Sequence, residues 1–130
     1  MTLLACVFAN HAVAEKPSTP AEFSSIVTGK SFDFSVGGTT YGREYYLPGN
    51  RVIWDDTSGR TCRQGKWYAQ NREICFVYED EPQTPKCWHF FEGTGGVHGL
   101  LFTNNDSDMR RYSMIESNGP MMCTDPDMAV

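Results

Sequence analysis

The chain has 130 residues, which is enough for one domain and too few for a second independent core. Its 16 acidic residues outnumber its 11 lysines and arginines, and the basic residues never gather beyond Arg110-Arg111. Because nucleic acids and anionic membranes are bound through clustered basic residues, this charge pattern argues against both kinds of partner.

Residues 1–14 have the character of the end of an export signal. They contain no charged side chain, and an apolar run leads to Ala12-Val13-Ala14, which is typical of a signal-peptidase site. The positively charged segment that opens such a signal is missing, so we expect the true start codon to lie upstream. Cleavage after Ala14 predicts one domain over residues 15–130, located in the periplasm or secreted.

Two other interpretations of this segment exist. Leu3-Leu4-Ala5-Cys6 loosely resembles a lipoprotein processing site, which would place a lipid on Cys6, but the tract that follows is too apolar for a flexible tether. A membrane anchor would need roughly 20 apolar residues, and the run is much shorter. We expect a mature protein with no transmembrane segment.

A short helix is predicted next. Thr19-Pro20-Ala21-Glu22 has the signature of a helix start, because threonine can cap, proline suits the first helical position and glutamate can complete a capping box. Gly29 supplies the stop. The apolar face between them is formed by Phe23, Ile26 and Val27. We expect a helix of about two turns that plugs one end of the fold.

After Lys30 apolar and polar residues alternate, interrupted by turn residues such as Pro48-Gly49-Asn50. The pattern predicts about eight short strands, over residues 32–36, 41–47, 52–54, 61–69, 72–79, 86–92, 97–103 and 111–116. A meander of this kind hides its edges most simply by closing on itself. We therefore predict an all-β fold, a small antiparallel up-and-down barrel with a short N-terminal helix; a β-sandwich is the alternative.

Four cysteines follow the helix: Cys62, Cys75, Cys87 and Cys123. In an oxidising compartment they predict two disulfides that cross-link the domain. Four cysteines allow three pairings, and the sequence does not choose among them. If the turn around Glu81 is tight, Cys75 faces Cys87, which leaves Cys62 for Cys123. Zinc is the competing interpretation, but no C-x-x-C occurs, and a catalytic thiol is favoured still less.

Three short motifs lie in this part of the chain, and two more precede them. They are Gly65-Lys66-Trp67, Cys75-Phe76-Val77-Tyr78 and Cys87-Trp88, preceded by Thr28-Gly29-Lys30 and Tyr45-Tyr46-Leu47-Pro48-Gly49. The series resembles small exported domains of alphaproteobacteria that are regarded as calycin-like barrels. The resemblance covers roughly residues 23–102. It implies an exported location and a calycin-like fold, and it assigns no catalytic residue.

Catalytic and metal-binding patterns are weak. His89 and His98 are expected on one face of a hairpin, but Glu92 lies on the other face and no third ligand is evident. The glycine tract over residues 93–96 precedes a strand rather than a helix, so it predicts a hairpin turn and not a phosphate loop. Glu44 and Asp55 could lie close enough in space to act as a catalytic carboxylate pair, but no sequence pattern fixes the distance between them. We expect no enzymatic activity, no metal and no cofactor.

The aromatic residues are the remaining candidates. Trp54, Trp67 and Trp88 occupy inward positions, where they either fill the barrel or line a cavity for a small apolar ligand. The outer face of the later strands would carry an apolar patch for a protein partner, formed by Phe91, Leu100 and Phe102. We expect a non-enzymatic periplasmic binding or interaction module. Its partner would be an envelope protein; the alternatives are a carrier of a small apolar ligand and an inhibitor of a cell-wall hydrolase.

Overall fold

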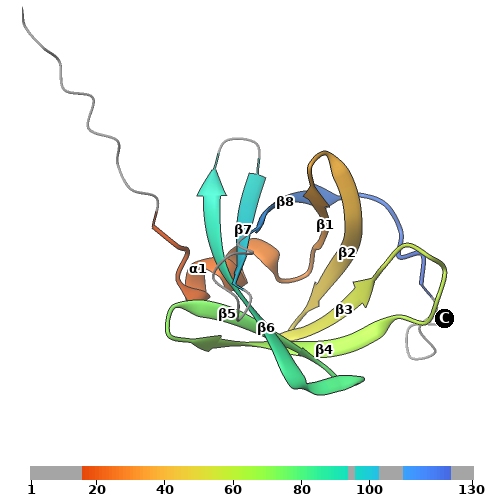
Figure 1. Cartoon of the computed structure of the whole chain (residues 1–130), viewed down its shortest axis with the longest axis horizontal. Coiled ribbons are helices and arrows are strands. Elements are labelled where there is room, and N and C mark those ends of the chain that lie inside the picture. Colours follow the sequence, from red (N-terminus) through yellow and green to blue (C-terminus); the bar gives the residue numbers. More distant parts are fainter. Residues whose placement is uncertain (1–15, 94–95, 103–109, 124–130) are drawn as a thin grey trace, which may run out of the picture.

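The computed structural model describes residues 16–93, 96–102 and 110–123, the segment 96–102 and Arg110 by their backbone (Figure 1). The predicted signal over residues 1–14, with Cys6, lies outside this part of the chain. The described residues form one helix and eight strands. The elements are α1 (Pro20–Val27), β1 (Ser31–Val36), β2 (Thr39–Leu47), β3 (Arg51–Asp55), β4 (Arg63–Gln70), β5 (Glu73–Tyr78), β6 (Glu81–Gly93), β7 (Gly96–Phe102) and β8 (Arg110–Ser117).

The strands pair in chain order, each antiparallel to the next, and β8 pairs with β1 to close the barrel. The closed antiparallel barrel confirms the predicted fold class. Closure leaves no unpaired edge along the meander. No described segment is a helix of the length and apolar character that a bilayer crossing requires.

The largest departure from the predicted strand limits is in β6. It begins at Glu81 instead of Lys86, because the β5–β6 turn is tighter than the prolines Pro82 and Pro85 indicate. These prolines are tolerated since Tyr78 pairs with Glu81 and the register then shifts, which marks a bulge. The bulge lies beside Tyr78, a residue that reappears in the candidate site.

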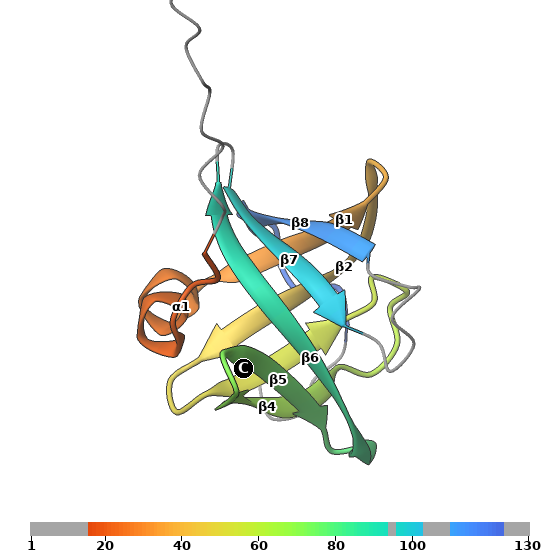
Figure 2. The ribbon, with the colours of Figure 1, turned by 60° about the vertical axis from the view of Figure 1, so that its left-hand side comes forward.

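The helix α1 closes one end of the barrel. The Thr19 side chain caps it by accepting a hydrogen bond from the Glu22 amide at 3.2 Å, as predicted. Just before the helix, the Ser18 amide donates to the Phe90 carbonyl, and just after it the Gly29 amide donates to the Tyr46 carbonyl. The helix is therefore attached to the barrel wall at both ends. Figure 2 shows it on the same side as the β2–β3 turn, and the β1–β2 and β3–β4 turns on the opposite side.

The core at this closed end is built around Phe23, which is fully buried. Its ring centroid lies 4.5 Å from that of Phe90, 5.3 Å from Trp67 and 5.7 Å from Tyr46. The contacts with Trp67 and Tyr46 are edge-to-face, an arrangement that adds to the gain from burial. The closed end is thus a solid aromatic core.

The cysteines form two disulfides, Cys75 with Cys87 and Cys62 with Cys123. Cys75 and Cys87 are directly opposite each other on β5 and β6, as the tight turn predicts. The second bridge joins residues 61 positions apart and attaches the chain after β8 to the loop between β3 and β4.

Candidate ligand site at the open end of the barrel

The end of the barrel opposite α1 contains two adjoining hollows, with cavity volumes of about 40 and 60 Å³, partly open to solvent. Five side chains line both of them: Tyr41, Trp54, Phe76, Tyr78 and Trp88. Phe34 and Glu44 complete the first hollow, and Arg63 and Lys86 complete the second. The open end is therefore mostly aromatic, with one carboxyl in its wall and two cations beside its opening.

Five aromatic rings contact one another in a closed cycle at this end. In order they are Tyr41, Trp54, Phe34, Trp88 and Tyr112, and successive ring centroids lie 5.6, 5.8, 6.0, 5.0 and 6.0 Å apart. The rings come from β1, β2, β3, β6 and β8. Tyr41 is the most exposed of them, at 56 %. We call these five residues the aromatic ring; all of them except Tyr112 line the first hollow.

Two glycines give these side chains their room. A Cβ atom on Gly42 would lie 2.3 Å from Cζ2 of Trp54, so the indole occupies the space that a side chain on β2 would take. A Cβ atom on Gly65 would lie 2.8 Å from Cδ1 of Tyr78 and 2.5 Å from the Val77 carbonyl oxygen. In both cases the bare backbone of one strand lets an aromatic side chain of the next strand lie across it.

Glu44 lies at the inner wall of the first hollow and is only 1 % exposed. Its Oε1 accepts a hydrogen bond from the Tyr78 hydroxyl at 2.8 Å, while its Oε2 is buried and has no partner among the described residues. Burial raises the pKa of this carboxyl to about 8, against the opposing effects of the Tyr78 hydrogen bond and of Arg63. Near neutral pH Glu44 is thus mostly a neutral acid with an unused polar atom.

Tyr46 follows Glu44 on the same inward face of β2 and is also fully buried. Its hydroxyl has no hydrogen-bond partner in the described part of the chain. Burial first, and then the nearby Glu44 charge, raise the pKa of this phenol well above its usual value. Two neighbouring buried polar groups are therefore left unsatisfied between the closed and the open end.

Arg63 packs on the Tyr78 ring, with its guanidinium carbon 4.6 Å from the ring centroid. It donates two hydrogen bonds to Asp80, of 2.8 and 2.9 Å, and lies 3.7 Å from a Glu81 oxygen. The Asp80 hydrogen bond raises the pKa of Arg63 and lowers that of Asp80. The cation nearest to Glu44 is thus already neutralised by two carboxylates at the β5–β6 turn.

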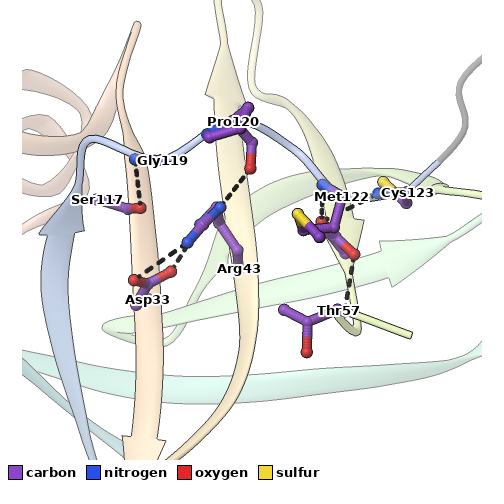
Figure 3. Close-up of polar contacts among 9 residues, drawn as sticks. Asp33, Arg43, Thr57, Ser117, Gly119, Pro120, Met122 and Cys123 are labelled. Carbon is purple, nitrogen blue, oxygen red and sulfur yellow. Dashed lines mark hydrogen bonds and ion pairs between the residues drawn. The ribbon is translucent and has the colours of Figure 1, made fainter. Parts of the chain in front are cut away.

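The rim of the open end is attached to the chain that follows β8. On the outer surface Arg43 forms an ion pair with Asp33 at 2.7 Å and also donates to the Pro120 carbonyl (Figure 3). Asp55, paired with Arg43 on the next strand, accepts hydrogen bonds from the Met122 and Cys123 amides. Together with the Cys62–Cys123 bridge, these contacts fix the tail beside the β3–β4 loop.

The structure separates the three tryptophans that the sequence singled out. Trp54 and Trp88 line the open hollows, whereas Trp67 packs on Phe23 at the closed end and is not among the lining residues. Sequence reasoning missed Glu44 as an interior group and Tyr41 as part of the opening. The signal for Glu44 was its alternation with Tyr46 in β2, which places a carboxyl on the inward face.

The weaker candidate patterns do not gather into a site. Glu44 and Asp55 point to opposite faces of the sheet, since Glu44 faces the hollow and Asp55 holds the tail. His89 Nε2 lies 3.7 Å from a carboxylate oxygen of Glu73. Glu73 has Cys75 and Cys87 within 4.8 Å, but these sulfurs form a disulfide and are not free ligands.

The predicted outer apolar patch is not supported by its one described side chain. Phe91 is only 8 % exposed, so it is packed rather than presented. The side chains of Leu100 and Phe102, and that of His98, lie outside the described part of the chain. The prediction of an exposed Phe91 was wrong, because the inside–outside alternation of a strand does not report what covers the outer face.

Comparisons of the chain with protein-family models, with curated proteins and with solved structures found no match. What the chain does is therefore argued from the geometry of the open end.

Proposed function

We propose that this chain is a non-enzymatic binding protein of the periplasm or the extracellular space, which holds a small ligand at the open end of its barrel. The single observation that carries this proposal is the hollow lined by Glu44 and by four residues of the aromatic ring, Phe34, Tyr41, Trp54 and Trp88. Eight-stranded barrels either fill their interior with side chains or hold one small ligand. This barrel has a filled end and a hollow end.

The energetics of Glu44 support a functional origin for the hollow. Burying a polar atom without a partner is unfavourable, and an apolar residue of similar size would avoid that loss. A convergent polar group with a shifted pKa in an otherwise apolar pocket is typical of binding and active sites. The carboxyl is therefore best explained by a ligand that satisfies it.

A binding role fits the chemistry of the lining better than catalysis does. Among the described residues that line the two hollows there is one carboxyl, and there is no histidine, serine or cysteine. Acid–base or nucleophilic catalysis needs a second group to exchange a proton or to attack. Among the described residues, the polar groups that act on Glu44 are phenols and the paired Arg63.

The proposed location rests on three observations. Two disulfides cross-link the domain, and such bonds persist outside the cytoplasm. The sequence of residues 1–14 predicts a cleaved export signal, and the motifs around Gly65 and Cys75 resemble exported calycin-like domains. Membership of that group is part of the proposal.

The test uses tryptophan fluorescence, because Trp54 and Trp88 line the hollow and Trp67 does not. The full chain is titrated with benzylamine, benzyl alcohol and benzoate, and native mass spectrometry examines protein purified from its own host. We expect saturable quenching by at least one probe, or a retained small molecule. If the folded protein shows neither saturable quenching nor a retained small molecule, the proposal is overturned.

A pair of variants locates the binding. Gly42→Ala pushes the Trp54 indole out of its place, because the added Cβ meets two rigid ring atoms at 2.3 and 2.5 Å. We expect it to weaken binding by about tenfold or more. Tyr68→Phe is the matched control, since Tyr68 is exposed on the outer surface of β4. Equal affinity in both variants would contradict a site in the hollow.

A further inference from the structure

Resting on the proposed function, we propose that the ligand of the open end carries a protonated amine, whose N–H group donates to Oε2 of Glu44 while its apolar part packs against the aromatic ring. The observations are the orphaned carboxyl oxygen, the aromatic lining and the arrangement of charges around them.

The first step is the hydrogen-bond inventory of Glu44. The Tyr78 hydroxyl donates to Oε1 at 2.8 Å, so that oxygen acts as an acceptor. Oε2 is buried and has no partner among the described residues. A ligand that donates a hydrogen bond would complete the carboxylate, because an ionised carboxylate accepts at both oxygens and donates at neither.

The second step is the aromatic lining. Trp54, Trp88 and Tyr41 present their rings around the same space, with Tyr78 beside Glu44. Aromatic faces carry negative charge density and attract cations, most strongly when the cation has lost its water. An ammonium group next to Glu44 would therefore meet favourable electrostatics from the walls as well as from the carboxylate.

The third step is the charge around the opening. The titratable and charged groups that face Glu44 or its opening in the described structure are Tyr78, Tyr46, Tyr41, Arg63 and Lys86. Arg63 is paired with Asp80 and Glu81, and Lys86 is close enough to Asp80 to lower the pKa of that carboxyl. Two cations thus face two surface carboxylates, so the positive charge that Glu44 meets from Arg63 is shared with Asp80 and Glu81.

Binding of an ammonium ion would then be coupled to proton release. Because burial raises the pKa of Glu44 to about 8, the free protein holds a proton on this carboxyl near pH 6.5. The ammonium ligand takes the place of that proton, so about one proton is released to the buffer for each ligand bound. A neutral ligand would release none. Amine affinity should rise with pH until Glu44 is ionised or the amine loses its own proton.

The experiment is isothermal titration calorimetry of the full chain with benzylamine, benzyl alcohol and benzoate, near pH 6.5 in two buffers of different ionisation enthalpy. We expect benzylamine to bind at least about tenfold more tightly than benzyl alcohol, because its ammonium group adds a charged hydrogen bond. Benzoate should bind more weakly than benzyl alcohol, because its negative charge is opposed by the like charge of Glu44. The observed enthalpy of benzylamine binding should differ between the two buffers by about the difference between their ionisation enthalpies, because about one proton is released.

Glu44→Gln tests the assignment to this carboxyl. The amide is similar in size and keeps an oxygen for the Tyr78 hydroxyl, but it cannot ionise and cannot release a proton. We expect the variant to lose the preference for benzylamine and the buffer-dependent heat, while benzyl alcohol binds as before. Circular dichroism reports that the variant is folded.

The outcomes separate this inference from the proposed function. Equal affinities for benzylamine and benzyl alcohol, or an unchanged preference in Glu44→Gln, would overturn the amine while leaving a ligand site in place. Tightest binding of benzoate would also overturn it and would point to Arg63 and Lys86 as the recognition groups. Binding of none of the three probes would overturn the inference, and with no retained small molecule it would remove the proposed function as well.

Discussion

The two ends of this barrel are built from the same kinds of residue and use them differently. At the closed end, α1 inserts Phe23 among Trp67, Tyr46 and Phe90, and the rings fill the space. At the open end, Trp54 and Trp88 line a hollow, and α1, the one helix of the described residues, lies at the other end (Figure 2). Aromatic content alone therefore does not distinguish a core from a site.

The difference extends to what holds each end together. The closed end is stabilised by packing and by backbone hydrogen bonds from the residues that flank α1. The rim of the open end is held by the Cys62–Cys123 bridge, the Arg43–Asp33 ion pair and the Arg63–Asp80 ion pair. A hollow gives up packing contacts, so its walls need covalent and ionic links that do not require a filled interior.

The largest expected effect is on the closed end. Phe23→Ala removes the ring at the centre of the packed core and should lower the free energy of unfolding by about 3–5 kcal/mol. Urea unfolding followed by circular dichroism measures it. Trp54→Ala is the matched change at the open end and should cost clearly less, because the indole is partly exposed. A Trp54 loss as large as the Phe23 loss would contradict the contrast between the ends.

The disulfides come next. Replacing Cys62 and Cys123 by serine should cost about 4 kcal/mol in the chain-entropy model, and replacing Cys75 and Cys87 about 3 kcal/mol, because the first bridge closes the longer loop. Thermal unfolding of the two double variants compares them. The rim variant should also weaken ligand binding, since it releases the tail. Greater destabilisation by loss of the shorter bridge would contradict the dependence on loop length.

Glu44 makes stability depend on pH. Its pKa is about 8 in the folded chain and near 4.5 when exposed, so between these values the folded state keeps a proton that the unfolded state releases. Stability is therefore greatest below about pH 4.5 as far as this group is concerned, and it falls as the pH rises toward 8. The fall amounts to on the order of 5 kcal/mol.

The comparison of wild type with Glu44→Gln isolates this contribution. Denaturant unfolding at a series of pH values should give curves that diverge as the pH rises, with the variant the more stable near pH 8. If the free energies of unfolding of the two proteins change in parallel with pH, Glu44 is not a buried acid and solvent reaches it at the open end.

The smallest effect is expected at the surface of the rim. Asp80→Asn removes the main partner of Arg63, but the Asp80 side chain is 56 % exposed, so the loss of stability should stay below about 1 kcal/mol. The informative readout is ligand affinity in low salt, since Arg63 would then carry an unbalanced positive charge near the site. Amine binding should weaken slightly, and an increase would contradict the charge arrangement around the opening.

Much of the fold could be predicted from the sequence, because period-two alternation and turn residues such as Pro48-Gly49-Asn50 report directly on strands and hairpins. The cap at Thr19 and the plug at Phe23 were also predictable, since capping chemistry is local. The start of β6 was not, because Pro82 and Pro85 locally oppose a strand that only the bulge permits.

The candidate site was only half predictable. Inward tryptophans could be recognised by alternation, but the division of Trp67 from Trp54 and Trp88 depends on where α1 inserts, which is a tertiary property. The roles of Gly42 and Gly65 depend on side chains from neighbouring strands. Glu44 was visible as a carboxyl on an inward face, yet its unsatisfied oxygen follows only from the packing around it.

The most direct test of a hollow, ligand-binding open end is the titration of Glu44 followed by NMR of its side-chain carboxyl carbon, in the free protein and with benzylamine. A buried acid beside an amine site predicts a midpoint near pH 8 in the free protein, lowered by about two to three units when the amine is bound, as the release of about one proton near pH 6.5 requires. A midpoint near the value of an exposed glutamate, unchanged by benzylamine, would contradict both the burial of the carboxyl and its role in recognition.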